Sequence, residues 1–173
     1  MSKRAFIVIG PVSTGTRLTT QILLAAGCHG SAEHKQPFDV EPITEDPVVW
    51  RRSVPHGNDW HYPELGEMLA KLQGYHTTLV VTIRDMVPTV LSQAARHRRI
   101  DPAESRGMNR LAYRHVFAQL ASSRLPFVLS VYESLILHPA FAQRALCRQL
   151  GLKLAEDDVV AVEDRDRVRW VES

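Results

Sequence analysis

The order of hydrophobic residues along the chain predicts strands that are buried on both faces. Three short runs have apolar residues without polar alternation, as in the inner strands of a parallel sheet. They are Ala5–Ile9, Thr78–Ile83 and Phe127–Val131. Apolar residues at helical spacing follow each run, which predicts a helix after each strand. These helices cover about 18–26, 87–95 and 139–150.

Two further stretches, 63–72 and 109–121, also have helical spacing. Strands that alternate with helices predict an α/β fold with a mainly parallel sheet, flanking helices and right-handed crossovers, arranged as a three-layer sandwich. Two independent cores would each be small at this length, so we expect one domain over 1–173.

The stretch 30–63 differs from the rest of the chain. It contains prolines at 37, 42, 47, 55 and 63 and shows little periodicity. A loop of this length inside a compact domain is usually functional or disordered. We therefore expect a long functional loop here.

Composition and charge narrow the function classes. Of the 173 residues, 45% are hydrophobic, as in ordinary globular domains, and the net charge of +2 argues against a generic nucleic-acid binder. No stretch approaches the ~20 apolar residues of a membrane span, and the first apolar run is too short for a signal peptide. Cys28 and Cys147 are too few for a disulfide framework and lack zinc-site spacing. We expect a cytoplasmic protein that needs no metal, membrane or nucleic acid.

The segment Gly10–Arg17 lies between the first predicted strand and its helix. A glycine-containing loop in this position turns backbone N–H groups toward a phosphate at a helix N-terminus. The glycine spacing is P-loop-like, but Thr16 stands where the triphosphate P-loop has lysine. To bind a single phosphate or a phosphosulfate, the protein needs less positive charge than to bind a triphosphate with Mg²⁺. Alternatively, a Gly-Pro turn and a Ser/Thr helix cap would explain Gly10, Pro11 and Thr14 without a ligand.

The same segment resembles the 5′-phosphosulfate loop of sulfotransferases that use 3′-phosphoadenosine 5′-phosphosulfate (PAPS). Its Gly-Thr-Arg sequence is similar to that of the heparan-type members. The resemblance implies a PAPS site formed by Ser13, Thr14, Gly15, Thr16 and Arg17. Ser13 stands where the family has a Lys or Arg that stabilises the bridging oxygen as the sulfuryl group leaves. Arg17, in the first helical turn, is the nearest replacement and is therefore a catalytic candidate.

A second motif follows the strand 78–83, where Ser92 comes eight positions after Arg84. Both side chains can converge on one anion at the carboxyl ends of the strands, where open α/β sheets bind ligands. In PAPS-dependent sulfotransferases, the 3′-phosphate motif is an Arg at a strand end with a Ser eight residues later. The resemblance implies this role for Arg84 and Ser92, although a local pair of Arg84 with Asp85 would also explain the arginine.

Two later segments extend the resemblance over about 5–152. Tyr132–Leu135 resembles the family's Tyr-Glu-Asp-Leu segment, and Leu150–Leu152 resembles its Leu-Gly-Leu segment. We expect the first of these to form a turn that leads into a helix.

Sulfuryl transfer to a hydroxyl or amine requires a base for the acceptor's proton. The resemblance points to Glu33 and His34, because related enzymes often place a Glu or His after the first helix. His56 and His61 in the same predicted loop are the alternatives, and each histidine is equally explained as a solvated loop residue.

The acceptor is a small molecule or a carbohydrate in this interpretation. Trp50, Trp60, Arg51 and Arg52 can form an acceptor surface, although a solvated surface explains them equally well. The short interval between the two phosphate motifs leaves this site open, or completed by another subunit of a homo-oligomer.

Two other functions remain open for the same fold. A phosphotransferase resembling a nucleotide kinase would use Asp85 to bind Mg²⁺, but the P-loop lysine is missing. A nucleotide-binding protein with little or no catalysis would result if nothing replaces the cation missing at Ser13. We favour a sulfotransferase that uses PAPS as co-substrate.

Overall fold

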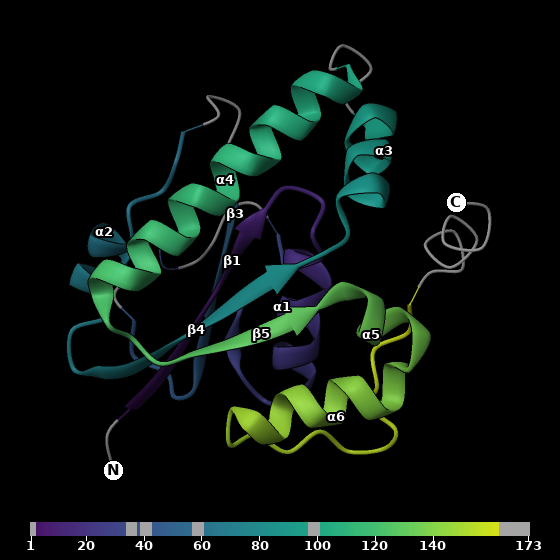
Figure 1. The fold of residues 1–173 in the computed structure, drawn as a ribbon. Helices are drawn as coiled ribbons and strands as arrows, with labels where there is room; N and C mark the ends of the chain where they lie inside the picture. Colours follow the sequence, from purple (N-terminus) through teal and green to yellow (C-terminus); the bar gives the residue numbers. More distant parts are fainter. Residues whose placement is uncertain (1–2, 34–37, 39–42, 57–60, 97–100, 163–173) are drawn as a thin grey trace.

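A central sheet is covered by helices (Figure 1). The computed structural model describes residues 3–33, 38, 43–56, 61–96 and 101–162, with the side chains of 94–96 left aside. Five parallel strands are arranged in the order β2-β3-β1-β4-β5. The strands are β1 (Lys3–Pro11), β2 (His29–Gly30), β3 (Val48–Val54), β4 (Tyr75–Ile83) and β5 (Phe127–Val131).

The helices fall largely where apolar residues recur at helical spacing. They are α1 (Thr16–Ala25), α2 (Leu65–Lys71), α3 (Met86–Arg96), α4 (Pro102–Ser123), α5 (Tyr132–Leu137) and α6 (Pro139–Gln149). Helix α4 begins seven residues before the predicted stretch 109–121, because Asp101 caps it. The Asp101 carboxylate accepts hydrogen bonds from the Ala103 and Glu104 N–H groups at 2.6 and 3.1 Å.

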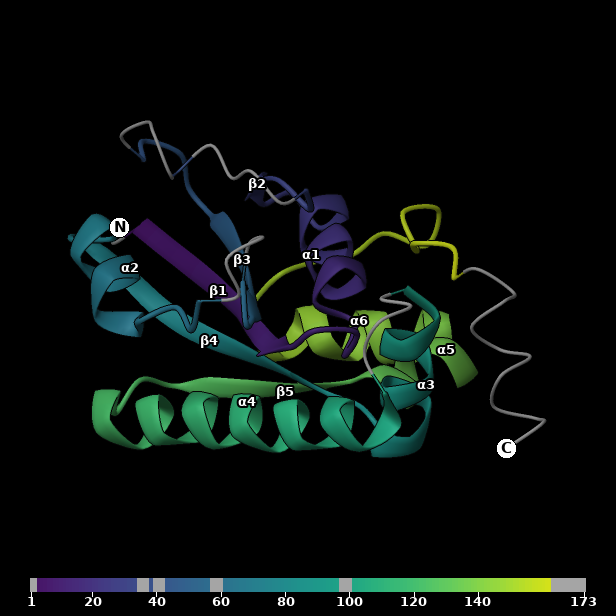
Figure 2. The same cartoon turned by 90° about the horizontal axis from the view of Figure 1, so that it is seen from above.

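Alternate residues of β1 face opposite layers of helices. Ala5, Ile7 and Ile9 belong to the apolar cluster that includes α2 and α4. Phe6 and Val8 belong to the cluster that includes α1, α5 and α6. Figure 2 shows α4 on one side of the sheet and α1 on the other. Because both faces of β1 are buried, its sequence lacks polar alternation. The predicted three-layer α/β fold with a parallel sheet is confirmed.

The prediction of one continuous loop over 30–63 is wrong in its middle, where β3 pairs with β1 and β2. Trp50, Arg51 and Arg52 are 2, 5 and 7% exposed and lie on this inner strand rather than on a loop surface. The Arg52 guanidinium lies 4.9 Å from the centroid of the Trp50 ring. The two arginines interrupt the apolar run, and their burial depends on packing that sequence periodicity does not reveal.

Two further features concern the cysteines and the helices. Cys28 and Cys147 are both buried free thiols. Across the described ranges, no helix combines the length and apolar character needed to cross a bilayer.

Candidate anion-binding site

The strand order reverses between β1 and β4. After β1 the chain continues through α1 to β2 and β3 on one side, and after β4 it continues through α3 and α4 to β5 on the other. Open α/β sheets bind ligands outside the carboxyl ends of the strands at such a reversal. The two segments that leave the sheet there are residues 12–15, after β1, and 84–85, after β4.

The loop after β1 contains two left-handed residues on either side of Thr14. Ser13 has φ 69° and Gly15 has φ 93°. This conformation costs a residue with a side chain roughly 1–2 kcal/mol, and such residues cluster at ligand sites. At Gly10 an added Cβ would lie 2.1 Å from the Thr82 hydroxyl oxygen, so glycine lets β1 approach β4 closely. The loop therefore has a fixed, compact backbone at the strand reversal.

Helix α1 starts from this loop without a side-chain cap, because its N-cap residue is Gly15. The Thr14 hydroxyl instead donates to the Pro11 carbonyl at 2.7 Å and lies 2.7 Å from the Thr82 hydroxyl. Thr14 therefore shapes the loop and does not act as the Ser/Thr helix cap considered above. The positive end of the α1 dipole faces the strand reversal, which favours an anion there.

Ser13 adds a buried hydroxyl to the loop. Its Oγ has no hydrogen-bond partner within the part of the chain that the structure describes. Buried polar atoms are normally hydrogen-bonded, and an exception in a native structure is often explained by an unseen ligand or water. A phosphate or sulfate oxygen would accept a hydrogen bond from this hydroxyl.

Arg84 joins the loop to the exit of β4. The residue is 8% exposed, and its Nη1 donates to the Ser13 carbonyl at 3.0 Å. Its guanidinium carbon lies 4.1 Å from the centroid of the Tyr132 ring. The same ring packs against Gly15, where an added Cβ would lie 2.5 Å from Tyr132 Cδ2. The structure thus brings together Arg84 and the loop after β1, two segments that the sequence singled out separately.

Asp85 and Ser92 follow Arg84 along the chain, at the start of α3 and within it. Asp85 Oδ1 accepts a hydrogen bond from the Val87 N–H at 2.8 Å, which caps the helix. The Asp85 N–H donates to Glu133 Oε1 at 2.8 Å. Ser92 lies two turns into α3 and is 2% exposed. Asp85 therefore has a structural role in this arrangement.

Gln93 also holds the loop, a role that was not predicted from the sequence. Its Nε2 donates to the Val12 carbonyl at 2.7 Å and to Asn109 Oδ1 at 3.1 Å. Gln93 is only 5% exposed and comes three residues after the buried Val90, on the same face of α3. A polar residue on the apolar face of a predicted helix was the signal that could have revealed it.

Two predicted catalytic residues contact each other at the surface. Arg17 Nη2 lies 2.6 Å from Glu33 Oε1, and the two side chains are 60 and 64% exposed. Burial lowers the pKa of Arg51 on the neighbouring strand, and the positive charge of Arg17 lowers it further. The charges of Arg17 and Arg51 therefore act on each other, and Glu33 partly balances them. His34 and Trp60, which were also predicted, lie outside the described residues.

The carboxyl end of β3 adjoins the same loop. The Val12 N–H donates to the Val54 carbonyl at 3.1 Å, and the hydroxyls of Thr16 and Ser53 are 3.2 Å apart. Beyond Val54, the His56 N–H donates to the His61 carbonyl at 2.8 Å, and the two imidazoles form an edge contact with centroids 5.9 Å apart. The two alternative base candidates are thus paired with each other near the loop.

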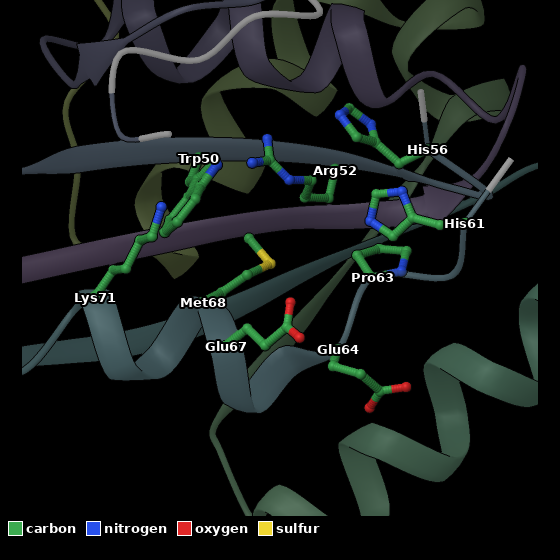
Figure 3. Close-up of a pocket in the computed structure, with 9 residues that line it drawn as sticks. All are labelled: Trp50, Arg52, His56, His61, Pro63, Glu64, Glu67, Met68 and Lys71. Atoms are coloured by element: carbon green, nitrogen blue, oxygen red, sulfur yellow. The ribbon is translucent and has the colours of Figure 1, made fainter. Parts of the chain in front are cut away.

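A cavity of about 310 Å³ extends from these histidines along β3 toward α2 (Figure 3). Trp50 and Arg52 line it from the strand, and Glu67 and Lys71 line it from the helix.

Comparison with models of protein families and with curated proteins finds no match to this chain. The function has to be inferred from the site itself.

The donor set of the site is made of hydroxyls, backbone amides and guanidinium groups. Across the described ranges, no group of three or more His, Cys, Asp or Glu side chains is arranged to hold a metal ion. Hydroxyls, amides and guanidinium groups are the usual partners of phosphate and sulfate oxygens. The arrangement is suited to binding one anionic ligand at two points, the loop after β1 and the exit of β4.

Proposed function

We propose that the protein is a sulfotransferase that binds PAPS between the loop Gly10–Arg17 and the pair Arg84 and Ser92, and transfers its sulfuryl group to a hydroxyl or amine. The hydrogen bond from Arg84 to the Ser13 carbonyl carries this proposal. It links, at the strand reversal, two segments that resemble the two phosphate motifs of this enzyme class.

The loop side of the site suits the 5′-phosphosulfate. The uncapped N-terminus of α1 and the Ser13 hydroxyl offer hydrogen-bond donors to phosphosulfate oxygens. These donors can hold one phosphosulfate, whereas a triphosphate with its metal also requires the lysine that Thr16 replaces.

The β4 side of the site suits the 3′-phosphate. Arg84 is buried, and its contacts with Ser13 and the Tyr132 ring hold its position before a ligand arrives. A guanidinium held in this way loses little conformational entropy when it binds a phosphate. The buried Ser92 lies on the helix that follows and supplies a hydroxyl.

The transfer itself requires polar groups where negative charge develops. The bond between sulfur and the bridging phosphate oxygen breaks as the acceptor forms its bond to sulfur, the acceptor's proton passes to a base, and adenosine 3′,5′-bisphosphate leaves. Ser13 supplies a neutral hydrogen bond to the leaving phosphate. Arg17, in the first turn of α1, supplies the cation that the family places at the Ser13 position.

The contacts of Asp85 favour this function over a nucleotide kinase. A kinase of this fold would use that carboxylate to bind Mg²⁺, but one of its oxygens already caps α3.

The two free thiols support our placement of the protein in the cytoplasm, where cysteines stay reduced.

Calorimetry with adenosine 3′,5′-bisphosphate tests the proposal. We expect binding without Mg²⁺, and no comparable binding of ATP with Mg²⁺. Absence of bisphosphate binding at millimolar concentration would refute the proposal, and Mg²⁺-dependent ATP binding would favour the kinase. A transfer rate from PAPS above the uncatalysed rate would exclude a binding protein without catalysis.

A further inference from the structure

The cavity beside β3 begins near the end of the strand that adjoins the loop after β1. His56 and His61 stand at one end of it (Figure 3), and His56 comes two residues after Val54, which pairs with Pro11 at the carboxyl end of β1. The hydrogen bond from the Val12 N–H to the Val54 carbonyl and the contact of Thr16 with Ser53 hold this end of β3 against the loop after β1. A molecule in the cavity would therefore reach toward the proposed phosphosulfate.

The size of the cavity limits what it can hold. Its volume of about 310 Å³ is at the lower end of the range for small-molecule pockets. It is bounded by β3 on one side and by α2 on the other, so that only a small molecule or the end of a larger one fits between them.

The walls of the cavity carry both signs of charge. The cations of Arg52 and Lys71 lie 4.9 and 5.7 Å from the centroid of the Trp50 ring. The Glu67 carboxylate points from α2 toward β3 in Figure 3. A ligand of either charge would meet a like charge in so small a space, which is unfavourable. Hydroxyl groups both donate and accept hydrogen bonds, so an uncharged hydroxylated ligand suits a wall that carries both signs of charge.

We propose that this cavity holds the acceptor of the sulfuryl transfer, and that the acceptor is an uncharged polyhydroxylated molecule or sugar end. This rests on the sulfotransferase function proposed above. An acceptor hydroxyl oxygen forms the bond to sulfur as the bond from sulfur to the bridging oxygen breaks. The hydroxyl proton passes to an imidazole of the His56 and His61 pair, and adenosine 3′,5′-bisphosphate leaves. His56 and His61 line the cavity, whereas Glu33 pairs with Arg17 and is not part of the lining.

Three sugars of the same ring size but different charge test the proposal. Glucose, glucuronate and glucosamine are titrated into the full chain with bound adenosine 3′,5′-bisphosphate, and the imidazole proton signals of His56 and His61 are followed by NMR. The His61→Gln variant assigns the signals. We expect glucose to shift them at lower concentration than either charged sugar.

A charge-neutralising variant on the cavity wall provides the second readout. Glu67 and Glu104 both lie in the exposed first turn of a helix, and only Glu67 lines the cavity. Glu67→Gln should improve the binding of glucuronate relative to glucose by about threefold, because one repulsive charge is removed. Glu104→Gln should leave this ratio unchanged.

The outcomes separate the two proposals. Bisphosphate binding without a glucose response, or with glucuronate preferred by the unmodified protein, would overturn the acceptor assignment and leave the sulfotransferase function standing. A glucose response without bisphosphate binding would overturn both the function and the acceptor role, and would leave only a sugar-binding cavity.

Discussion

Two arginines are assigned to the proposed donor site, one from a buried region and one from an exposed region. Arg84, at the exit of β4, is 8% exposed and is held by the Ser13 carbonyl and the Tyr132 ring. Arg17, at the start of α1, has a side chain that is 60% exposed and forms an ion pair with Glu33. One guanidinium is fixed before the ligand binds, whereas the other is solvated and held mainly by one neighbour.

This difference predicts a division of roles. A cation that is already in place contributes fully to ground-state affinity, because little entropy is lost when the ligand binds. An exposed cation gains most when negative charge develops on the leaving phosphate, and an interaction of that kind acts on kcat. We therefore expect Arg84 to determine donor affinity and Arg17 to determine turnover.

The largest effect is expected for a substitution that displaces the Tyr132 ring, which supports Arg84. In Gly15→Ala the new methyl group would meet the Tyr132 ring at 2.5 Å in a left-handed residue. We expect the free energy of unfolding to fall by about 2–4 kcal/mol, through overpacking and the cost of the backbone conformation.

Gly27→Ala is the matched control for this prediction. Gly27 has nearly the same φ, +91° against +93°, but nothing lies within 4 Å of its added Cβ. This variant should lose only the backbone term, roughly 1–2 kcal/mol. Urea denaturation measures both values, and equal losses would show that Tyr132 does not brace the loop.

The next largest effect is expected for Arg84 itself. Arg84→Ala should weaken the binding of adenosine 3′,5′-bisphosphate about 10- to 100-fold, because charge-assisted hydrogen bonds contribute roughly 1.5–3 kcal/mol. Arg148→Ala, in the exposed last turn of α6, should leave the affinity unchanged. Calorimetry compares the two variants, and similar affinities would remove Arg84 from the donor site.

Arg17→Ala should have the reverse signature. We expect kcat to fall about tenfold or more, while the affinity for the bisphosphate changes less than about threefold. Steady-state kinetics and calorimetry on the same preparation give the two numbers. Equal losses in both would mean that Arg17 only anchors the bound donor.

Salt should produce the smallest effect. Exposed charges are screened as the Debye length falls from about 8 Å at physiological ionic strength to about 3 Å at 1 M salt, and buried ones are screened less. The kcat ratio between the unmodified protein and Arg17→Ala should therefore shrink severalfold as KCl is raised. The affinity ratio for Arg84→Ala should change much less, and a parallel decline would contradict the difference in burial.

Much of the fold is predictable from the sequence because the inner strands are buried on both faces. The run Phe127–Val131 matches β5 at both ends, and the run Ala5–Ile9 lies wholly within β1. Strand β3 is not predictable in this way, since Arg51 and Arg52 interrupt its apolar pattern. Their burial depends on neighbours such as the Trp50 ring and on the pairing with β1, which are tertiary features.

The two anion motifs of the site follow from local sequence, but the contacts that join them do not. Glycine spacing after one strand and an arginine after another are visible in the chain. The hydrogen bond from Gln93 to the Val12 carbonyl spans 81 positions, and the one from Arg84 to the Ser13 carbonyl spans 71. Such contacts arise only once the sheet has brought the ends of β1 and β4 together.

The assignment of Arg84 to the 3′-phosphate can be decided by a comparison of two ligands. Calorimetry measures how much Arg84→Ala weakens the binding of adenosine 3′,5′-bisphosphate and of adenosine 5′-monophosphate, which lacks that group. We predict a loss of about 10- to 100-fold for the bisphosphate and less than about twofold for the monophosphate. Equal losses for the two ligands would contradict the assignment, because Arg84 would then be acting on a part that both share.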